Sequence, residues 1–334
     1  MNELLDKVSI MVDESVMIPF DIKGIVKAIC RGYVRESNGK IPLDGIENVC
    51  NTTFVKIDSD NTSFTGENKI MGETDTKYDK NCNVSHVMSY VEFSNMIKLV
   101  TILCHELGHV MTEFNPCAIS NGVYGVVKRT AGIYTNCEYN DSGDLLASGL
   151  YGFRISDGFL ESICSRIFAS QEFREEILEC GIDLKDYVYK DERLFPSRIY
   201  DEYKACFELF DYVMDGVLFD FSCKKYEDNK SLVDDINKLK INKIFGYLDA
   251  SNDALWKLKR YEGKERDEEF LSLMADYKDK KDTAVNLVYV LLDMYGKDVD
   301  DERFKELLDA YANGLDKQKL LPISSTDFGM PSMS

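Results

Sequence analysis

The chain has 334 residues, enough for one large domain or two, and a hydrophobic content of 44 %, which is ordinary for a globular protein. Its formal net charge of −19 argues against nucleic-acid phosphates and anionic membrane surfaces as partners. No apolar run approaches the roughly 18 residues of a membrane-spanning helix, so no membrane segment is expected.

The first residues, Met1 to Lys7, contain neither a basic segment nor an apolar run of signal-peptide length. The ten cysteines are widely spread and form no C-x-x-C pair, so they do not suggest a zinc knuckle. Without a secretion signal, we expect them to be reduced and mostly buried. We therefore expect a cytoplasmic protein, with leaderless export as the alternative.

The predicted elements begin with two short helices, over 3–13 and 21–35. The segments 52–57 and 84–90 are rich in β-branched and aromatic residues and are separated by turn-forming residues, so they are predicted to be strands of a small sheet. His86 lies in the second of these strands. It is either a strand residue with a polar partner or a further candidate metal ligand.

The most informative stretch, from Thr101 to Phe114, contains H-E-x-x-H at His105, Glu106 and His109. Two histidines four residues apart share one face of a helix, so both imidazoles can reach one metal ion. Zinc binds such nitrogens at about 2.0–2.1 Å, and catalytic sites add a third protein ligand and a water. Glu106 is then placed to take the proton of the metal-bound water as that water attacks a carbonyl. We expect one zinc ion per chain.

A buried helix is predicted around this motif, with Ser94 as its N-cap and Pro116 just past its end. The alternative is an ordinary amphipathic helix whose histidines have polar partners. Apolar residues recur at steps of one, three or four, at Leu99, Val100, Leu103, Leu107, Val110 and Phe114.

A second important helix is predicted over 155–168 from an apolar stripe that includes Phe159. Asp157 and Glu161 are four residues apart near its start, on one face. The preceding stretch, 115–155, is too long for a structureless loop, so we expect short strands or helices there that form one wall of a cleft.

The remainder of the chain is predicted to be mainly helical, with glycines at expected C-caps. The expected helices are 171–180, 197–222, 231–247, 252–262, 265–279, 283–295 and 301–313, and the glycines are Gly181, Gly263, Gly296 and Gly314. We expect three parts: a metal-binding catalytic domain over 1–170, a helical domain over 171–322 that closes the cleft, and a disordered tail over 323–334.

The H-E-L-G-H helix, followed by Asp157-Gly158-Phe159 and Glu161, resembles the gluzincin branch of zinc metallopeptidases. Aminopeptidases of that branch carry N-E-G-F, whose Glu is the third zinc ligand, and some bacterial proteins carry N-E-G-x-T-E. On that pattern Asp157 falls on the ligand, and Glu161 falls on a second acidic position that supports the metal site. The resemblance covers roughly a tenth of the chain. It implies a zincin-like fold, in which the last strand before the motif helix is an edge strand that borders the substrate groove.

The sequence departs from this family at the ligand, where Asp157 replaces Glu. In one interpretation Asp157 binds the metal and Glu161 hydrogen-bonds a ligating histidine. In another, Glu161 binds the metal and Asp157 is only a helix N-cap; in a third, neither binds. The metzincin pattern is excluded because the required third histidine is replaced by Asn115, and the glycine-rich signatures of peptide deformylase are absent.

Gluzincins often stabilise the oxyanion of the transition state with a Tyr or His. Tyr151, six residues before Asp157, is the candidate for that role here, followed by Tyr134 and Tyr124. Each is equally explained as a packing tyrosine.

These features together predict an α+β protein with a zincin-like catalytic region, a small mixed sheet and a helical C-terminal region. The expected function is zinc-dependent hydrolysis of peptide bonds, with a peptide or protein as substrate and with Glu106 activating the water. The alternative is a catalytically inactive zincin-like module that binds a peptide or partner, as a sensor or an immunity protein.

Overall fold

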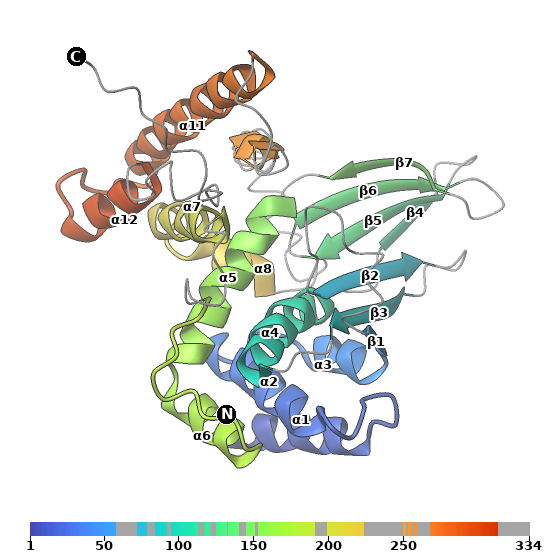
Figure 1. Ribbon diagram of the computed structural model, residues 1–334. Coiled ribbons are helices and arrows are strands. Elements are labelled where there is room, and N and C mark those ends of the chain that lie inside the picture. Colours follow the sequence, from blue (N-terminus) through green and yellow to red (C-terminus); the bar gives the residue numbers. More distant parts are fainter. Residues whose placement is uncertain are drawn as a thin grey trace, which may run out of the picture.

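The computed structural model combines helices with two small sheets, which confirms the α+β class (Figure 1). All structural statements below concern the residues that it describes. These are 1–57, 72–78, 84–91, 95–112, 117–120, 125–131, 133–139, 145–150, 153–190, 199–223, 250–251, 253–255, 257–258 and 268–312.

The three N-terminal helices are α1 (Asn2–Glu14), α2 (Lys23–Glu36) and α3 (Leu43–Cys50) (Figure 1). Helices α2 and α3 pack against the motif helix, and α1 packs against both of them. The first two agree with the predicted helices. The third was not predicted, because Pro42 and Gly45, residues that often interrupt a helix, fall within this short stretch. Pro42 instead stands at the N-cap, and a Cβ atom on Gly45 would lie 2.2 Å from the carbonyl oxygen of Met111, so glycine allows α3 to approach the motif helix closely.

The first sheet contains β1 (Thr53–Ile57), β2 (Gly72–Tyr78) and β3 (Val84–Val91). Their order is β1-β3-β2, with β1 parallel and β2 antiparallel to β3. The expectation that the last strand before the motif helix lies at the sheet edge was therefore wrong. That strand, β3, is central, and the outer place beside the motif helix is taken by β2, whose G-E-T-D-T-K-Y sequence lacks a strand's apolar alternation.

The motif helix α4 (Met96–Thr112) is buried along most of its length. Its first amide groups are capped by Asn95, whose Oδ1 accepts from the backbone N–H of Ile97 at 3.0 Å and of Lys98 at 3.4 Å. Asn95 thus has the role expected of Ser94, which lies outside the described residues, as does Pro116.

The stretch expected to hold short elements forms a second, antiparallel sheet in the order β4-β5-β6-β7. Its strands are β4 (Cys117–Ser120), β5 (Gly125–Ala131), β6 (Ile133–Tyr139) and β7 (Leu145–Leu150).

Helix α5 (Phe153–Ala169) runs between the motif helix and the C-terminal helices, and packs against α2, α4 and α7 (Figure 1). The helices after it are α6 (Gln171–Glu179), α7 (Ile199–Val213), α8 (Val217–Cys223), α11 (Glu268–Met294) and α12 (Glu302–Ala312).

The C-terminal helices differ from the prediction at two places. The expected helix 197–222 is interrupted by left-handed residues, Asp215 at φ 58° and Gly216 at φ 78°. The expected helices 265–279 and 283–295 are one continuous helix, because the residues between them include no Gly or Pro. The expected helix 231–247 lies outside the described residues.

One cluster of buried side chains extends from Leu5 in α1 to Tyr311 in α12 and so includes residues on both sides of position 170. The division into domains at that position stays a prediction. Within the described residues, no helix is long and apolar enough to cross a membrane.

Candidate metal centre

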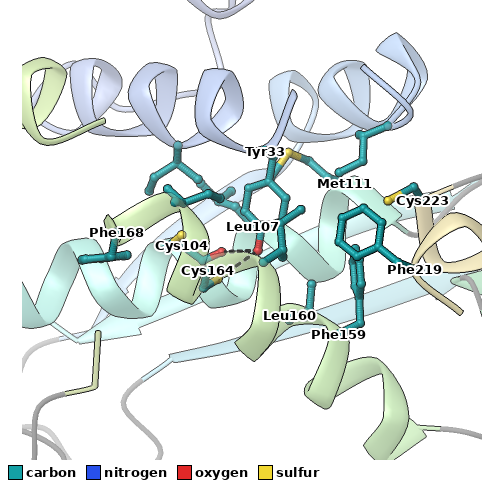
Figure 2. Packing of buried hydrophobic residues seen from close by; sticks show 14 of the residues in the cluster. Tyr33, Cys104, Leu107, Met111, Phe159, Leu160, Cys164, Phe168, Phe219 and Cys223 are labelled. Carbon is teal, nitrogen blue, oxygen red and sulfur yellow. Dashed lines mark hydrogen bonds between the residues drawn. The ribbon is translucent and has the colours of Figure 1, made fainter. Parts of the chain in front are cut away.

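Helix α4 is held in place by a close contact at Gly108, between its two histidines. Tyr33 of α2 donates its hydroxyl proton to the carbonyl oxygen of Cys104 at 2.9 Å and lies 3.1 Å from Sγ of Cys164 on α5 (Figure 2). A Cβ atom on Gly108 would lie 2.1 Å from the Tyr33 hydroxyl and 2.6 Å from Cδ2 of Leu160. Glycine at this position therefore lets three helices meet, which fixes the rotation of the motif helix.

Helix α5 brings two carboxylates to the same place. Asp157 and Glu161 are both buried, with 4 % and 2 % of their surface exposed. Between them, Gly158 approaches α7 closely, since a Cβ atom there would lie 2.4 Å from the backbone oxygen of Tyr203 and 2.9 Å from Cβ of Phe207. Asp157 lies inside α5, which begins at Phe153, so the interpretation of Asp157 as a helix N-cap was wrong.

The structure brings His105, His109 and Asp157 together as a group that could hold a metal ion. One ligand atom from each lies within 4.8 Å of the others. Nε2 of His109 is 3.5 Å from Oδ1 of Asp157. Two atoms bound to one tetrahedral zinc ion at 2.0–2.1 Å are separated by about 3.3–3.4 Å, so this pair already has nearly the spacing of two ligands of one ion.

Glu161 does not belong to that group and instead lies beside His105. Its Oε1 is 2.8 Å from Nδ1 of His105, a close contact of a buried nitrogen that has no other hydrogen-bond partner among the described residues. The same oxygen contacts Nζ of Lys190 and is 3.4 Å from the Tyr189 hydroxyl. Burial acts to raise the pKa of Glu161, but the Lys190 ammonium and the His105 imidazole outweigh it and hold the pKa below its usual value. A charged Glu161 on Nδ1 leaves Nε2 of His105 for a metal.

Glu106, between the two histidines, is held by the edge strand. The Thr74 hydroxyl of β2 donates to its Oε2 at 2.9 Å and lies 3.2 Å from its backbone oxygen. Part of the residue is exposed, but protein atoms surround the carboxyl group, and this burial raises its pKa. The charges of His105 and Lys190 and the Thr74 hydrogen bond oppose the shift, and Asp157 reinforces it. A carboxylate with a raised pKa is a better proton acceptor.

His105 is also buried, with 7 % of its surface exposed. Burial and the Lys190 ammonium act to lower its pKa, but Glu161 and Glu106 outweigh them, and the pKa is raised above 6.5. The ring of Tyr200, at the start of α7, packs edge-on against His105 with 5.6 Å between ring centroids.

Three neighbours of the site, Thr74, Lys190 and Tyr200, were not identified from the sequence. Thr74 lies in a strand that was not predicted. Lys190 and Tyr200 lie far from the motif in the chain. Tyr200 reaches it because α7 packs on α5, which in turn packs on α4, and Lys190 reaches it on a segment that Arg174 anchors. For Tyr200 the sequence offered one weak indication, which is its position in the first turn of the predicted helix 197–222.

The other candidates are placed as follows. Tyr151 and Tyr124 lie outside the described residues, and the side chain of Tyr134, in β6, is not described. His86 is buried in β3, where it pairs in register with Thr76, and it is not a member of the group that could hold a metal.

Comparisons with protein-family models, with curated proteins and with solved structures found no match to this chain.

Proposed function

We propose that this protein is a zinc-dependent metallopeptidase with a zincin-like catalytic region. The observation that carries the proposal is that buried His105, half-buried His109 and buried Asp157 lie together, with Glu106 on the same helix as the histidines. The gluzincin-like sequence pattern supports it, because the second helix delivers its acidic residues to the histidines of the first.

The donor set suits zinc. Two imidazole nitrogens and one carboxylate oxygen leave a fourth tetrahedral position open, which is the arrangement of catalytic zinc sites. His105, His109 and Asp157 would hold the ion, and Glu161 would orient His105 through its outer ring nitrogen. Two histidines and one carboxylate also suit iron(II), so metal analysis is part of the test.

The chemistry divides between the ion and the chain. Zinc in such a site supplies Lewis-acid activation of water and of the substrate carbonyl. Glu106 takes the proton of the attacking water and later passes it to the leaving amine. Thr74 orients this carboxylate from the strand side. Tyr200 packs against His105 and is a second candidate donor to the developing oxyanion, in addition to the sequence candidate Tyr151.

An extended peptide is the substrate that the sheet accommodates best. Among the described strands, β1 and β2 are the two outer strands of the first sheet, and it is Thr74 of β2 that contacts Glu106. A peptide that pairs with the outer edge of β2 through backbone hydrogen bonds would pass next to this carboxylate. Backbone pairing gives affinity that does not depend on the peptide's side chains. Cleavage specificity would therefore depend on the protein residues that contact those side chains.

The test combines metal analysis with a mixed peptide library. The purified protein should contain about one zinc per chain and cleave library peptides. Glu106→Gln should keep the zinc and the fold but lose at least about 10²-fold in turnover, the scale for removal of a positioned base. Glu47→Gln, at an exposed position on α3, is the matched control and should behave as wild type.

Two outcomes would overturn the proposal. Iron in place of zinc in the purified protein would argue against a zinc hydrolase. Turnover by Glu106→Gln equal to that of the wild type would show that Glu106 is not the general base. Zinc binding without cleavage of any peptide would favour the alternative, a non-catalytic module that binds a peptide or partner.

A further inference from the structure

Lys190 is delivered to the metal centre by a tightly anchored segment, residues 181–190. The guanidinium of Arg174 on α6 donates to backbone carbonyl groups along this segment, to Leu184 at 2.7 Å, Lys185 at 2.9 Å and Tyr187 at 3.0 Å. Its Nε also donates to the carbonyl of Phe168, at the end of α5, at 2.8 Å. One half-buried guanidinium thus ties the segment to the helix that carries Asp157 and Glu161.

The end of this segment is held in a conformation that the backbone disfavours. Lys190 has φ 52°, in the left-handed region that L-residues other than glycine seldom adopt. Its N–H donates to the Tyr187 hydroxyl at 3.1 Å, and that hydroxyl is 3.0 Å from Oγ1 of Thr101 on α4. The conformation is therefore imposed by contacts to the motif helix, and it turns the side chain toward the metal centre.

The ammonium of Lys190 is enclosed there, with only 12 % of the side chain exposed. It contacts Oε1 of Glu161 and lies over the Tyr200 ring, 3.7 Å from the centroid. A buried lysine is costly to desolvate unless its charge is paired. The ion pair with Glu161 therefore stabilises the enclosed ammonium of Lys190 in this position.

The charged side chains around the site leave a net charge that one divalent cation would neutralise. Three carboxylates, of Glu106, Asp157 and Glu161, face two histidines and Lys190. When all three are ionised, Lys190 offsets one negative charge, and the two that remain equal the charge of one divalent cation. Asp157 lies with the histidines in the group that could hold the metal, whereas Glu161 lies with Lys190.

We propose that Lys190 is a positioning residue that keeps Glu161 on Nδ1 of His105 and out of the coordination sphere of the metal. The inference rests on the proposed zinc site. Glu161 is a longer side chain than Asp157 and shares its helix face, so without Lys190 the metal is the nearest cation for its buried charge. Removal of Lys190 should then convert a four-coordinate site into a five-coordinate one, which zinc tolerates.

The experiment uses the full chain loaded with cobalt(II), whose visible absorption is stronger in four-coordinate than in five-coordinate sites. Lys190→Met should weaken this absorption, and Lys190→Arg, which keeps the charge, should restore it. Lys190→Met combined with Glu161→Gln should also restore it, because the carboxylate that would bind is gone. Lys185→Met, at an exposed position on the same segment, is the matched control and should leave the spectrum unchanged.

Zinc affinity, measured by competition with a chelator, is the second readout. In the wild type, Glu161→Gln should cost about 10–100-fold, as for loss of an outer partner of a ligand. In the Lys190→Met background the same substitution should cost more, because it removes a direct ligand. Equal costs in both backgrounds would overturn the inference, as would a Lys190→Met spectrum that matches the wild type.

The design separates this inference from the proposed function. A wild-type protein that binds neither cobalt nor zinc would refute the metal site itself. A wild type that binds metal, with no effect of Lys190→Met, would refute only the role of Lys190. If Lys190→Met fails to fold, the double variant should fold because the unpaired charge is removed, and failure of both would refute the pairing.

Discussion

Gly158→Ala tests the packing that places Asp157 beside the histidines. A methyl group on residue 158 would lie 2.4 Å from the backbone oxygen of Tyr203, about 0.9 Å inside an ordinary carbon–oxygen contact. A backbone carbonyl within α7 cannot rotate away, so α5 and α7 must separate. Overpacking of this kind costs about 3 kcal/mol or slightly more, and the better helix propensity of Ala returns about 1 kcal/mol. We expect a net loss of about 2 kcal/mol.

The assay is urea unfolding of the metal-free protein, followed by zinc titration of the folded variant. The matched control is Gly24→Ala in α2, where the added methyl would meet only Sγ of the exposed Cys180, at 2.8 Å. That sulfur can rotate, so the control should be neutral or slightly stabilised. Because Asp157 precedes Gly158, zinc affinity should also fall in Gly158→Ala. A Gly158→Ala protein as stable as the control, with unchanged zinc affinity, would refute the close approach of α5 and α7.

Further predictions concern single contacts. Asp157→Ala should strip zinc from the protein, whereas Glu161→Ala should lose only about 10–100-fold in zinc affinity by chelator competition, and the reverse ranking would exchange their roles. Thr74→Val should lower kcat about tenfold at unchanged KM, since Glu106 loses a hydrogen bond of about 1.5 kcal/mol; an unchanged kcat would deny this orienting role. Burial acts to raise the pKa of Glu176, but its ion pairs with Arg31 and Arg35 of α2 outweigh burial and lower that pKa. Its carboxylate therefore stabilises the fold above its unfolded pKa of about 4.3, and this contribution disappears as pH falls through the lower folded pKa. Glu176→Gln should cost about 1–3 kcal/mol by urea unfolding at pH 7 and progressively less below about pH 4, whereas a pH-independent difference would contradict the pairing.

The parts of the fold that follow a strong periodic pattern could be predicted from the sequence. Helix α4 has an apolar residue at nearly every core-facing position, and α5 has the stripe that contains Phe159, so both were expected close to their observed ranges. The i, i+4 spacing of Asp157 and Glu161 placed both on one face for the same reason.

The parts that depend on contacts distant in the chain could not be predicted. Strand β2 is polar and takes its place only by pairing with β3 and by packing Gly72 against Ile102 of α4. Lys190 meets Glu161 across 29 residues, through a segment shaped by Arg174 rather than by a local motif. Neither contact leaves a periodic signal, because each is specified by the packed helices around it.

A crystal structure of the zinc-loaded protein, with the metal located by anomalous scattering at the zinc edge, tests the central claim most directly. We predict one zinc ion bound by one nitrogen each of His105 and His109 and by a carboxylate oxygen of Asp157, each within about 2.2 Å, with Glu161 remaining on Nδ1 of His105. An oxygen of Glu161 within that distance, with Asp157 turned away, would reverse the ligand assignment. A zinc ion found elsewhere, with both histidines unbound, would contradict the account of this site as a metal centre.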